Sequence, residues 1–196
     1  MVYGSGTLAL AAVALLRHLF DGVEVWAVTR QGRRAEMAAA SGAHAVLPSE
    51  PSALVSTVAR RLGARTLVPW SGQEWLQDGP AVVYDTIGSV ETIETSLRLL
   101  DTGGALVVSG VEPPRRFEWT PIYFKELQVI GSNAFGIEEV GGVRKHAFEH
   151  YFDWVAQGLD LGGLVTHRFK LADWQRAVLT AASARSSGAV KVVLRP

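Results

Sequence analysis

Along the first 133 residues, short apolar runs alternate with segments whose apolar positions recur at helical spacing. The runs predict strands at residues 1–3, 23–29, 45–47, 81–85, 105–109 and 127–131, and the intervening segments predict helices at 7–19, 33–40, 52–62 and 90–100. Continuous apolar runs are typical of parallel strands that are buried on both faces. Their alternation with helices of about 10 to 15 residues indicates βαβ units. We therefore predict an α/β fold with a doubly wound parallel sheet and helices on both faces.

Two segments depart from this rhythm. Residues 66–80 contain Trp70, Trp75, two prolines and two glycines, and we expect a long apolar loop over the sheet edge rather than a ligand contact. After Asn133, a glycine-rich stretch precedes a predicted helix at 142–157, a strand at 164–169, a helix at 172–182 and a strand at 190–194. The sequence thus predicts one domain over residues 1–133 and a C-terminal α+β segment over residues 134–196.

The composition narrows the classes of function. Apolar residues make up 48% and charged residues 19% of the 196 residues, which indicates a folded chain with a core. The net charge is zero, so no global field favours nucleic acid or a membrane surface. The absence of cysteine excludes disulfides, cysteine-ligated metals and a cysteine nucleophile within this chain. The apolar run at 8–16 is short and lacks a preceding basic residue, so we expect a soluble, cytoplasmic protein rather than a secreted or membrane-bound one.

The turn after the first strand matches the pattern G-x-G-x-x-[G/A] from Gly4 to Ala9. It follows an apolar strand and opens an apolar helix, which is the context that a dinucleotide site requires. Gly4 would form the tight turn and Gly6 would let the backbone approach a pyrophosphate. Free N–H groups and the helix dipole would attract the phosphates. We predict a cofactor site formed by Gly4, Ser5, Gly6, Thr7 and Leu8; the alternative is a βα turn that uses glycine only for its geometry.

The end of the second strand indicates which dinucleotide binds. An NAD site usually has a carboxylate there, for the ribose hydroxyls. Here the chain reads Thr29-Arg30-Gln31-Gly32-Arg33-Arg34, with no acid and three arginines. Guanidinium groups attract a 2′-phosphate that a carboxylate would repel. We therefore predict NADP(H) rather than NAD(H), with Thr29, Arg30 and Arg34 in the site. The alternative is a solvated basic turn, and the missing acid also argues against S-adenosylmethionine.

A series of further motifs adds to the glycine turn. In order and spacing, these segments resemble the medium-chain, zinc-dependent alcohol dehydrogenases, in particular the branch with glucose- and threonine-dehydrogenase-like members. Each segment is weakly specific alone, but the series spans nearly the whole chain. The matching segments are residues 4–9, 41–46 (Ser-Gly-Ala-His-Ala-Val), 84–88 (Tyr-Asp-Thr-Ile-Gly), 103–110, 124–127 with 130–132, 164–169 (Leu-Val-Thr-His-Arg-Phe) and 188–193 (Gly-Ala-Val-Lys-Val-Val).

The resemblance implies further site residues. Residues 85–88 would pass the adenosine side of the cofactor. Ser109, Gly110 and Val111 would meet the nicotinamide carboxamide, and Ser132 and Asn133 would lie beside its ring. Lys191 would reach the pyrophosphate, or else be a surface lysine on a strand.

The resemblance also implies an activity. The complete enzyme would transfer hydride between the nicotinamide and a small alcohol, aldehyde or polyol. Its zinc ligands would come from an amino-terminal domain that this sequence lacks, so we expect no catalytic or metal-binding residue here. Only three residues precede Gly4, fewer than the about five or six of a typical strand, which indicates a fragment or a wrongly assigned start. We expect the isolated chain to be inactive.

The resemblance also bears on the C-terminal tail and on the assembly of the full-length protein. The tail after Asn133 would expose an apolar face that the domain covers, and the full-length form would pair along the sixth strand. A stand-alone nucleotide-binding module without turnover and a zinc-free quinone-reductase-like enzyme remain alternatives.

Other chemistries have weaker support. Residues 146–150 spell H-x-x-E-H, but no glutamate follows Glu149 as a further zinc ligand, so His146 and His150 are expected on a solvated helix face. No tyrosine is followed four residues later by lysine, which excludes short-chain dehydrogenase chemistry. Gly4-Ser5-Gly6 is not a nucleophile elbow. For Asp85, we expect a capping role rather than acid–base catalysis.

Overall fold

The computed structural model of the chain describes residues 1–30, 32–70, 72–113, 115–133 and 135–196. Its largest unit is a six-stranded parallel sheet with the strand order β3-β2-β1-β6-β7-β8. The chain starts in the middle of this sheet and winds outward to each edge in turn, which confirms the predicted doubly wound fold. The strands are β1 (Val2–Tyr3), β2 (Trp26–Val28), β3 (Ala45–Leu47), β6 (Val82–Asp85), β7 (Ala105–Val108) and β8 (Gln128–Gly131).

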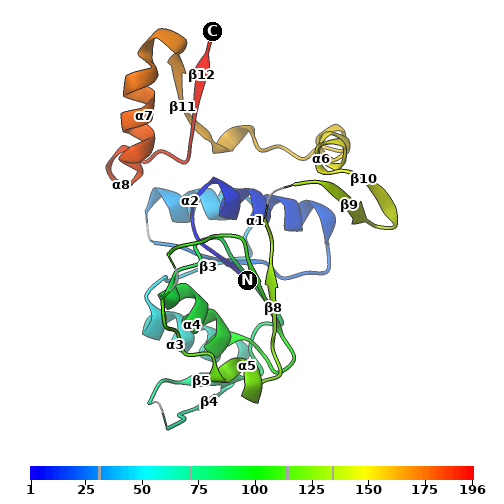
Figure 1. Cartoon of the computed structure of the whole chain (residues 1–196), viewed down its shortest axis with the longest axis vertical. Helices are drawn as coiled ribbons and strands as arrows, with labels where there is room; N and C mark the ends of the chain where they lie inside the picture. The colour runs from blue at the N-terminus through cyan, green and yellow to red at the C-terminus, as the bar shows by residue number, and fades with distance from the viewer. Residues whose placement is uncertain (31, 71, 114, 134) are drawn as a thin grey trace.

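Helices cover both faces of the sheet. Helices α1 (Thr7–Leu19) and α2 (Arg33–Ala40) lie on one face, and α3 (Pro51–Leu62) and α4 (Val90–Leu99) lie on the other (Figure 1). Each pair encloses its own apolar cluster, one with Leu10 and Val13 of α1 and one with Leu54 of α3 and Leu97 of α4. The short helix α5 (Thr120–Phe124) precedes the edge strand β8. We call residues 1–133, which contain the sheet and these helices, the sheet domain.

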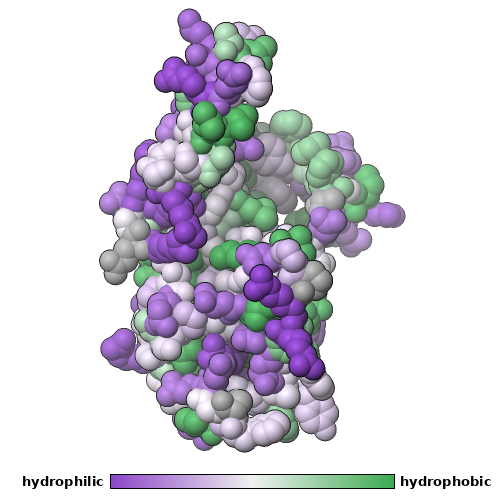
Figure 2. Space-filling view, turned by 60° about the vertical axis from the view of Figure 1, so that its left-hand side comes forward, coloured by the Kyte–Doolittle hydropathy of each residue, from purple (hydrophilic) through white to green (hydrophobic). Residues whose placement is uncertain are grey.

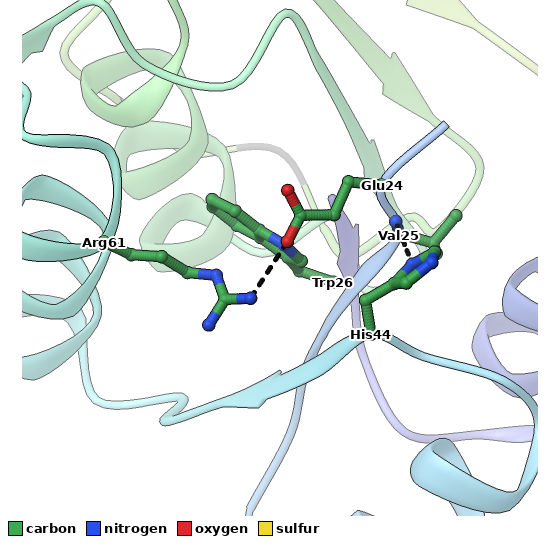
Figure 3. A network of polar contacts seen from close by, with 5 residues as sticks. All are labelled: Glu24, Val25, Trp26, His44 and Arg61. Carbon is green, nitrogen blue, oxygen red and sulfur yellow. Dashed lines mark hydrogen bonds and ion pairs between the residues drawn. The ribbon is translucent and has the colours of Figure 1, made fainter. Parts of the chain in front are cut away.

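A polar network fixes the start of β2 (Figure 3). The carboxylate of Glu24 accepts hydrogen bonds from the Trp26 indole at 2.7 Å and from the Arg61 guanidinium at 2.9 Å. That guanidinium also lies over the Trp26 ring, 5.0 Å from its centroid. On the opposite side, His44 Nδ1 accepts a hydrogen bond of 2.9 Å from the Val25 amide. The network ties β2 to α3 and to the start of β3, and so fixes the strand that leads to the arginine-rich loop.

The segment predicted as a long loop contains a hairpin, so that prediction is wrong. Strand β4 (Arg65–Leu67) pairs antiparallel with β5 (Trp75–Gln77). Trp75 and Leu76 are buried, and β5 packs against α3 and α4. Trp70, between the two strands, is 87% exposed. Burial of one strand beneath two helices explains the apolar content that had indicated a flap.

The first part of the predicted helix at 142–157 is also wrong. Strand β9 (Ile137–Val140) and strand β10 (Val143–His146) form an antiparallel hairpin. Gly141 and Gly142 join them with φ angles of 59° and 77°, which glycine adopts at little cost. Helix α6 (Ala147–Ala156) begins only afterwards, capped by His146. Residue 134, where the second segment was predicted to begin, lies outside the described residues.

The polar face of helix α6, which was expected to be solvated, is turned toward the rest of the chain. His150 is buried, with Nε2 3.2 Å from the carbonyl oxygen of Glu138 on β9 and its ring stacked on Trp154. Phe148 and Phe152 are 52% and 65% exposed. The polar side of the helix thus contacts the hairpin, while apolar side chains face outward. Figure 2 shows apolar side chains on the surface of this C-terminal part of the molecule.

The remainder of the chain forms a small layer next to α1 and α2 (Figure 1), and Leu164 of this layer packs into the apolar cluster of α1. Strand β11 (Val165–Lys170) is parallel to β12 (Lys191–Arg195), and α7 (Trp174–Ala182) packs on both. Short helical turns η1 (Gly162–Leu164), η2 (Leu171–Asp173) and α8 (Ala184–Ser187) complete it. Together with the β9–β10 hairpin and α6, this layer makes up the C-terminal segment, residues 135–196. No helix in the described ranges is long and apolar enough to cross a bilayer.

Candidate functional site

The glycine turn connects β1 to α1 at the carboxyl end of the sheet. The Gly4 amide donates to the Val28 carbonyl at 3.0 Å, and Gly4 has a φ of 131°. A Cβ on Gly4 would lie 2.1 Å from Thr86 Oγ1 and 3.4 Å from the Cβ of Ala9. A side chain therefore does not fit at Gly4, as a tight turn with close helix packing requires.

Gly6 has a different environment. It is the N-cap of α1, and no atom lies within 4 Å of the position that a Cβ would take. The structure thus leaves open space in front of the first turn of α1, whose N–H groups lack partners within the helix. A phosphate group could reach these amides directly.

That open space belongs to a cleft of about 720 Å³. The cleft brings together Ser5, Gly6, Thr7 and Leu8 of the glycine turn with Arg30 and Arg34, six of the predicted site residues. Its other lining residues are Arg33 of the arginine-rich loop, Thr86 and Ile87 of the loop expected beside the adenosine, and three residues that the sequence did not mark, Ala184, Arg185 and Gly188. The lining contains four arginines and no carboxylate, so the cleft is suited to an anionic ligand.

The predicted arginines differ in their contacts. Arg30 is exposed, whereas Arg34 is half-buried and forms hydrogen bonds with backbone carbonyls. Arg34 donates to the carbonyl oxygens of Ser5 at 2.8 Å, Ala189 at 3.2 Å and Ala184 at 3.4 Å. Gln31, between them, lies outside the described residues. Thr29 is buried, and its hydroxyl donates to the Arg30 carbonyl at 3.3 Å, so it shapes the loop and does not line the cleft.

Asp85, at the end of β6, has the capping role expected of it. Its buried carboxylate accepts hydrogen bonds from the amides of Ile87 and Gly88 and, at 2.7 Å, from the Thr92 hydroxyl. These donors fix the loop after β6 and the start of α4. A Cβ on Gly88 would lie 2.0 Å from the carbonyl oxygen of Gly110, so this loop and the one after β7 are in direct backbone contact.

The residues expected at the nicotinamide end lie at the carboxyl ends of β7 and β8. Ser109 donates its amide to the Asp85 carbonyl at 2.9 Å, and Ser132 donates its amide to the Val108 carbonyl at 2.8 Å. Val111 is 91% exposed, and Ser132 and Asn133 are exposed too. These residues follow adjacent strands, but they are outside the lining of the arginine cleft.

Lys191 is exposed at the start of β12. The preceding residue, Val190, accepts a hydrogen bond of 2.7 Å from the Thr7 hydroxyl at the start of α1. The backbone at Lys191 is therefore close to the glycine turn, although its side chain does not line the cleft.

Tyr3 is the last residue of β1 and directly precedes the glycine turn. Its phenol is buried and donates to the Ser49 carbonyl at 3.3 Å. Burial, followed by the negative charges of Glu91 and Asp85, raises the pKa of Tyr3 to about 12. The phenol is thus neutral at physiological pH and serves as a structural hydrogen-bond donor.

Comparison with known protein families shows that this chain is related to dehydrogenases. The family model described as zinc-binding dehydrogenase matches residues 7–157. The L-threonine 3-dehydrogenase of Paraburkholderia phytofirmans is 28% identical over 207 residues, which cover 99% of this chain and 50% of that protein. The chain thus spans about half the length of the curated relatives it matches.

Solved structures share the fold. A structure described as a short chain alcohol dehydrogenase from E. coli CFT073, complexed with NADH, has a TM-score of 0.77 at 22% identity. A structure described as a zinc-binding dehydrogenase from Sinorhizobium meliloti, bound to NADP, has a TM-score of 0.67 at 24% identity. Each match covers 100% of this chain and 51% of the other. Among the described residues of this chain, no group of three or more histidines, aspartates and glutamates could hold a metal ion.

Proposed function

Because the chain belongs to the zinc-binding dehydrogenase family, we propose that it forms the NADP(H)-binding part of an oxidoreductase acting on small alcohols or polyols. The arginine cleft in front of the α1 N-terminus is the observation that supports this proposal most directly. A dinucleotide carries negative charge on its pyrophosphate, and NADP(H) carries more on its 2′-phosphate. Both charges match the cleft, because its lining contains no carboxylate.

The glycine turn would bind the pyrophosphate. The amides of Gly6, Thr7 and Leu8 begin α1, and the space in front of Gly6 admits a phosphate without displacing an atom. Arg30, with Arg33 beside it, would attract the 2′-phosphate, and Arg34 lines the same cleft. Lys191 follows the residue bonded to Thr7 and would add positive charge near the pyrophosphate.

The nicotinamide would lie toward β7 and β8. Backbone groups of Ser109, Gly110 and Val111 would orient its carboxamide, and Ser132 and Asn133 would flank the ring. When bound, the cofactor supplies the hydride donor or acceptor, and this chain binds and orients it. The described residues do not offer a ligand set for zinc, so we derive no step through a metal.

The substrate class and the assembly are also proposals. The matched relatives are about twice as long as this chain, and their names refer to threonine and other small alcohols. We propose that the present chain has no turnover by itself and that the complete protein pairs along β8. That strand is an exposed edge of the sheet, with Val129 and Ile130 50% and 45% exposed.

Titration of the purified chain with NADPH and NADH tests this function, with cofactor fluorescence as the readout. We expect NADPH to bind at least tenfold more tightly. Arg30→Ala should lower NADPH affinity and leave NADH affinity unchanged, since only NADPH carries the 2′-phosphate. Gly6→Ala should weaken both cofactors, because its methyl group occupies the path of the pyrophosphate. Arg60→Ala, an exposed arginine on α3 outside the cleft, is the matched control.

Three results would contradict the proposal. Equal affinity for the two cofactors would refute the 2′-phosphate assignment. Failure of both cofactors to bind a folded chain, or a Gly6→Ala variant that binds them as the parent does, would refute the dinucleotide site itself.

A further inference from the structure

The cleft is closed on one side by a part of the chain far away in sequence. Ala184, Arg185 and Gly188 belong to α8 and the turn after it, in the C-terminal segment, and they face the loop that follows β2. Figure 1 shows α8 next to α2. If a Cβ is placed on Gly188, it lies 3.4 Å from the Arg33 guanidinium, so the two walls of the cleft are in contact.

Arg34 joins these two walls. One nitrogen of its guanidinium donates to Ser5 in the glycine turn, at 2.8 Å from the carbonyl and 3.4 Å from the hydroxyl oxygen. The other nitrogen donates to the carbonyls of Ala184 at 3.4 Å and Ala189 at 3.2 Å, the first at the start of α8 and the second two residues after its end. The planar fork of arginine is suited to such a bridge, because its donors point in fixed directions. Arg34 thereby fixes α8 relative to the glycine turn.

The short turn is also fixed from within. The Ser187 hydroxyl donates to the Thr180 carbonyl at 2.8 Å and accepts from the Ala189 amide at 3.2 Å. The position of Arg185 in the cleft thus follows from local hydrogen bonds and from the Arg34 bridge.

The charges in the cleft are unbalanced. Its lining contains Arg30, Arg33, Arg34 and Arg185 and no acid. The ion pairs found in the described part of the chain involve other basic residues, namely Arg61, Arg65, Lys145 and Arg176. Like charges in one cleft repel each other, and a bound dianion would offset this repulsion.

We propose that Arg185 is a further ligand of the 2′-phosphate and that Arg34 is the positioning residue that brings it there. This inference rests on the proposed NADP(H) function and extends it to a specificity-determining residue in the C-terminal segment. Arg30 and Arg33 then bind the phosphate from the sheet domain, and Arg185 binds it from the opposite wall.

The test measures the ratio of affinities for adenosine 2′,5′-bisphosphate and AMP, which differ only in the 2′-phosphate, on the full 196-residue chain. We expect Arg185→Ala to reduce this ratio about tenfold or more, as for the loss of a hydrogen bond to a charged group. Arg34→Ala should reduce it by a similar factor. Arg34→Lys should reduce it too, since a lysine keeps the charge but cannot make the forked bridge. Arg176→Ala, on the neighbouring helix α7 and outside the cleft, should leave the ratio unchanged.

The double variant Arg34→Ala/Arg185→Ala distinguishes positioning from direct binding. If Arg34 acts through Arg185, the double variant is no worse than Arg185→Ala alone, and circular dichroism spectra of all variants match the parent. Additive losses would show that Arg34 binds the phosphate directly and would overturn its positioning role. An unchanged ratio in Arg185→Ala, with a parent chain that still prefers the bisphosphate, would overturn the role of Arg185 alone. A parent chain without that preference would instead refute the proposed NADP(H) function.

Discussion

The sheet domain and the C-terminal segment use apolar residues in opposite ways. In the sheet domain, Leu97, Leu99, Leu100 and Leu106 are fully buried, and both faces of the sheet are covered. In the C-terminal segment, four apolar residues are buried, namely Leu159, Leu164, Ala177 and Ala189. Many larger ones are exposed, among them Phe148, Phe152, Trp174, Val178 and Leu179.

This difference separates what stabilises the chain from what completes the site. Burial of apolar surface is the main favourable term in folding, so the sheet domain supplies most of the stability. The C-terminal segment contributes a wall of the cleft and the residue that accepts from Thr7. An exposed apolar surface of this kind is typical of a site of protein contact. Substitutions in the two regions should therefore differ in their effect on stability and on the site.

Paired leucine truncations should give the largest contrast. Leu106→Ala, at a fully buried position in β7, should lower the free energy of unfolding by about 2 to 5 kcal/mol. Leu179→Ala, on α7 with 68% exposure, should change it by less than about 0.5 kcal/mol. Urea unfolding followed by circular dichroism measures both. Equal losses would show that the C-terminal segment has a core of its own and would remove the contrast.

Replacement of one glycine in each region by alanine should give the second-largest contrast in stability. At Gly4 a Cβ would lie 2.1 Å from Thr86 Oγ1 on a backbone with a φ of 131°, so Gly4→Ala should cost about 2 to 3 kcal/mol. At Gly163 no atom lies within 4 Å of the added Cβ, and Gly163→Ala should be neutral within about 0.5 kcal/mol. Thermal unfolding of the two variants tests this, and a tolerated Gly4→Ala would mean that the turn is not tightly packed.

The sequence predicted the sheet domain well because its signals are local. Each strand of the sheet lies within an apolar run of the sequence, and helix α1 was predicted with its observed bounds. The β4–β5 hairpin was missed because its burial depends on α3 and α4, which no short window reveals. The β9–β10 hairpin was missed for a similar reason. Its apolar residues Ile137, Val140 and Val143 recur at every third position, a spacing compatible with a helix, and only the Gly141-Gly142 turn marked its reversal.

The candidate site was predictable where one stretch of chain forms it. The glycine turn and Arg30 are local to the βα unit, so the motif located them. Arg185 was missed because it reaches the cleft only through the return of the C-terminal segment. Arg34 was assigned to a phosphate from its charge alone, and its bonds to Ser5 and Ala189 depend on the fold.

A buried lysine makes the sheet domain sensitive to pH. Burial lowers the pKa of Lys125 from 10.5 to about 8, while Nζ donates to the carbonyls of Leu97 and Arg98 at 3.3 and 3.1 Å. Between these two pKa values the unfolded chain binds more protons than the folded one. The contribution of Lys125 to stability therefore rises with pH across this interval, by about 2 kcal/mol between pH 7 and 9.5.

Comparison with Lys125→Met isolates this contribution. Below pH 8 the free energies of unfolding of the parent and the variant should differ by a nearly constant amount. Above pH 8 the free energy of unfolding of the parent should rise relative to that of the variant. The raised pKa of Tyr3, about 12, affects both proteins equally and cancels in the difference. Urea unfolding at pH 7, 8 and 9.5 measures that difference. A difference that does not change with pH would mean that Lys125 is solvated in the folded chain.

The smallest expected effect concerns the link between the two regions. Thr7 donates through its hydroxyl to the Val190 carbonyl at 2.7 Å, so Thr7→Val removes one hydrogen bond at nearly constant shape. We expect a loss of about 1 kcal/mol, and faster hydrogen exchange confined to β11 and β12. Thr180→Val is the control, because its hydroxyl bonds only within α7, to the Arg176 carbonyl at 2.8 Å. Faster exchange that spread to the central strands of the sheet would show that the two regions unfold as one unit, and that the sheet domain depends on the C-terminal segment for its stability.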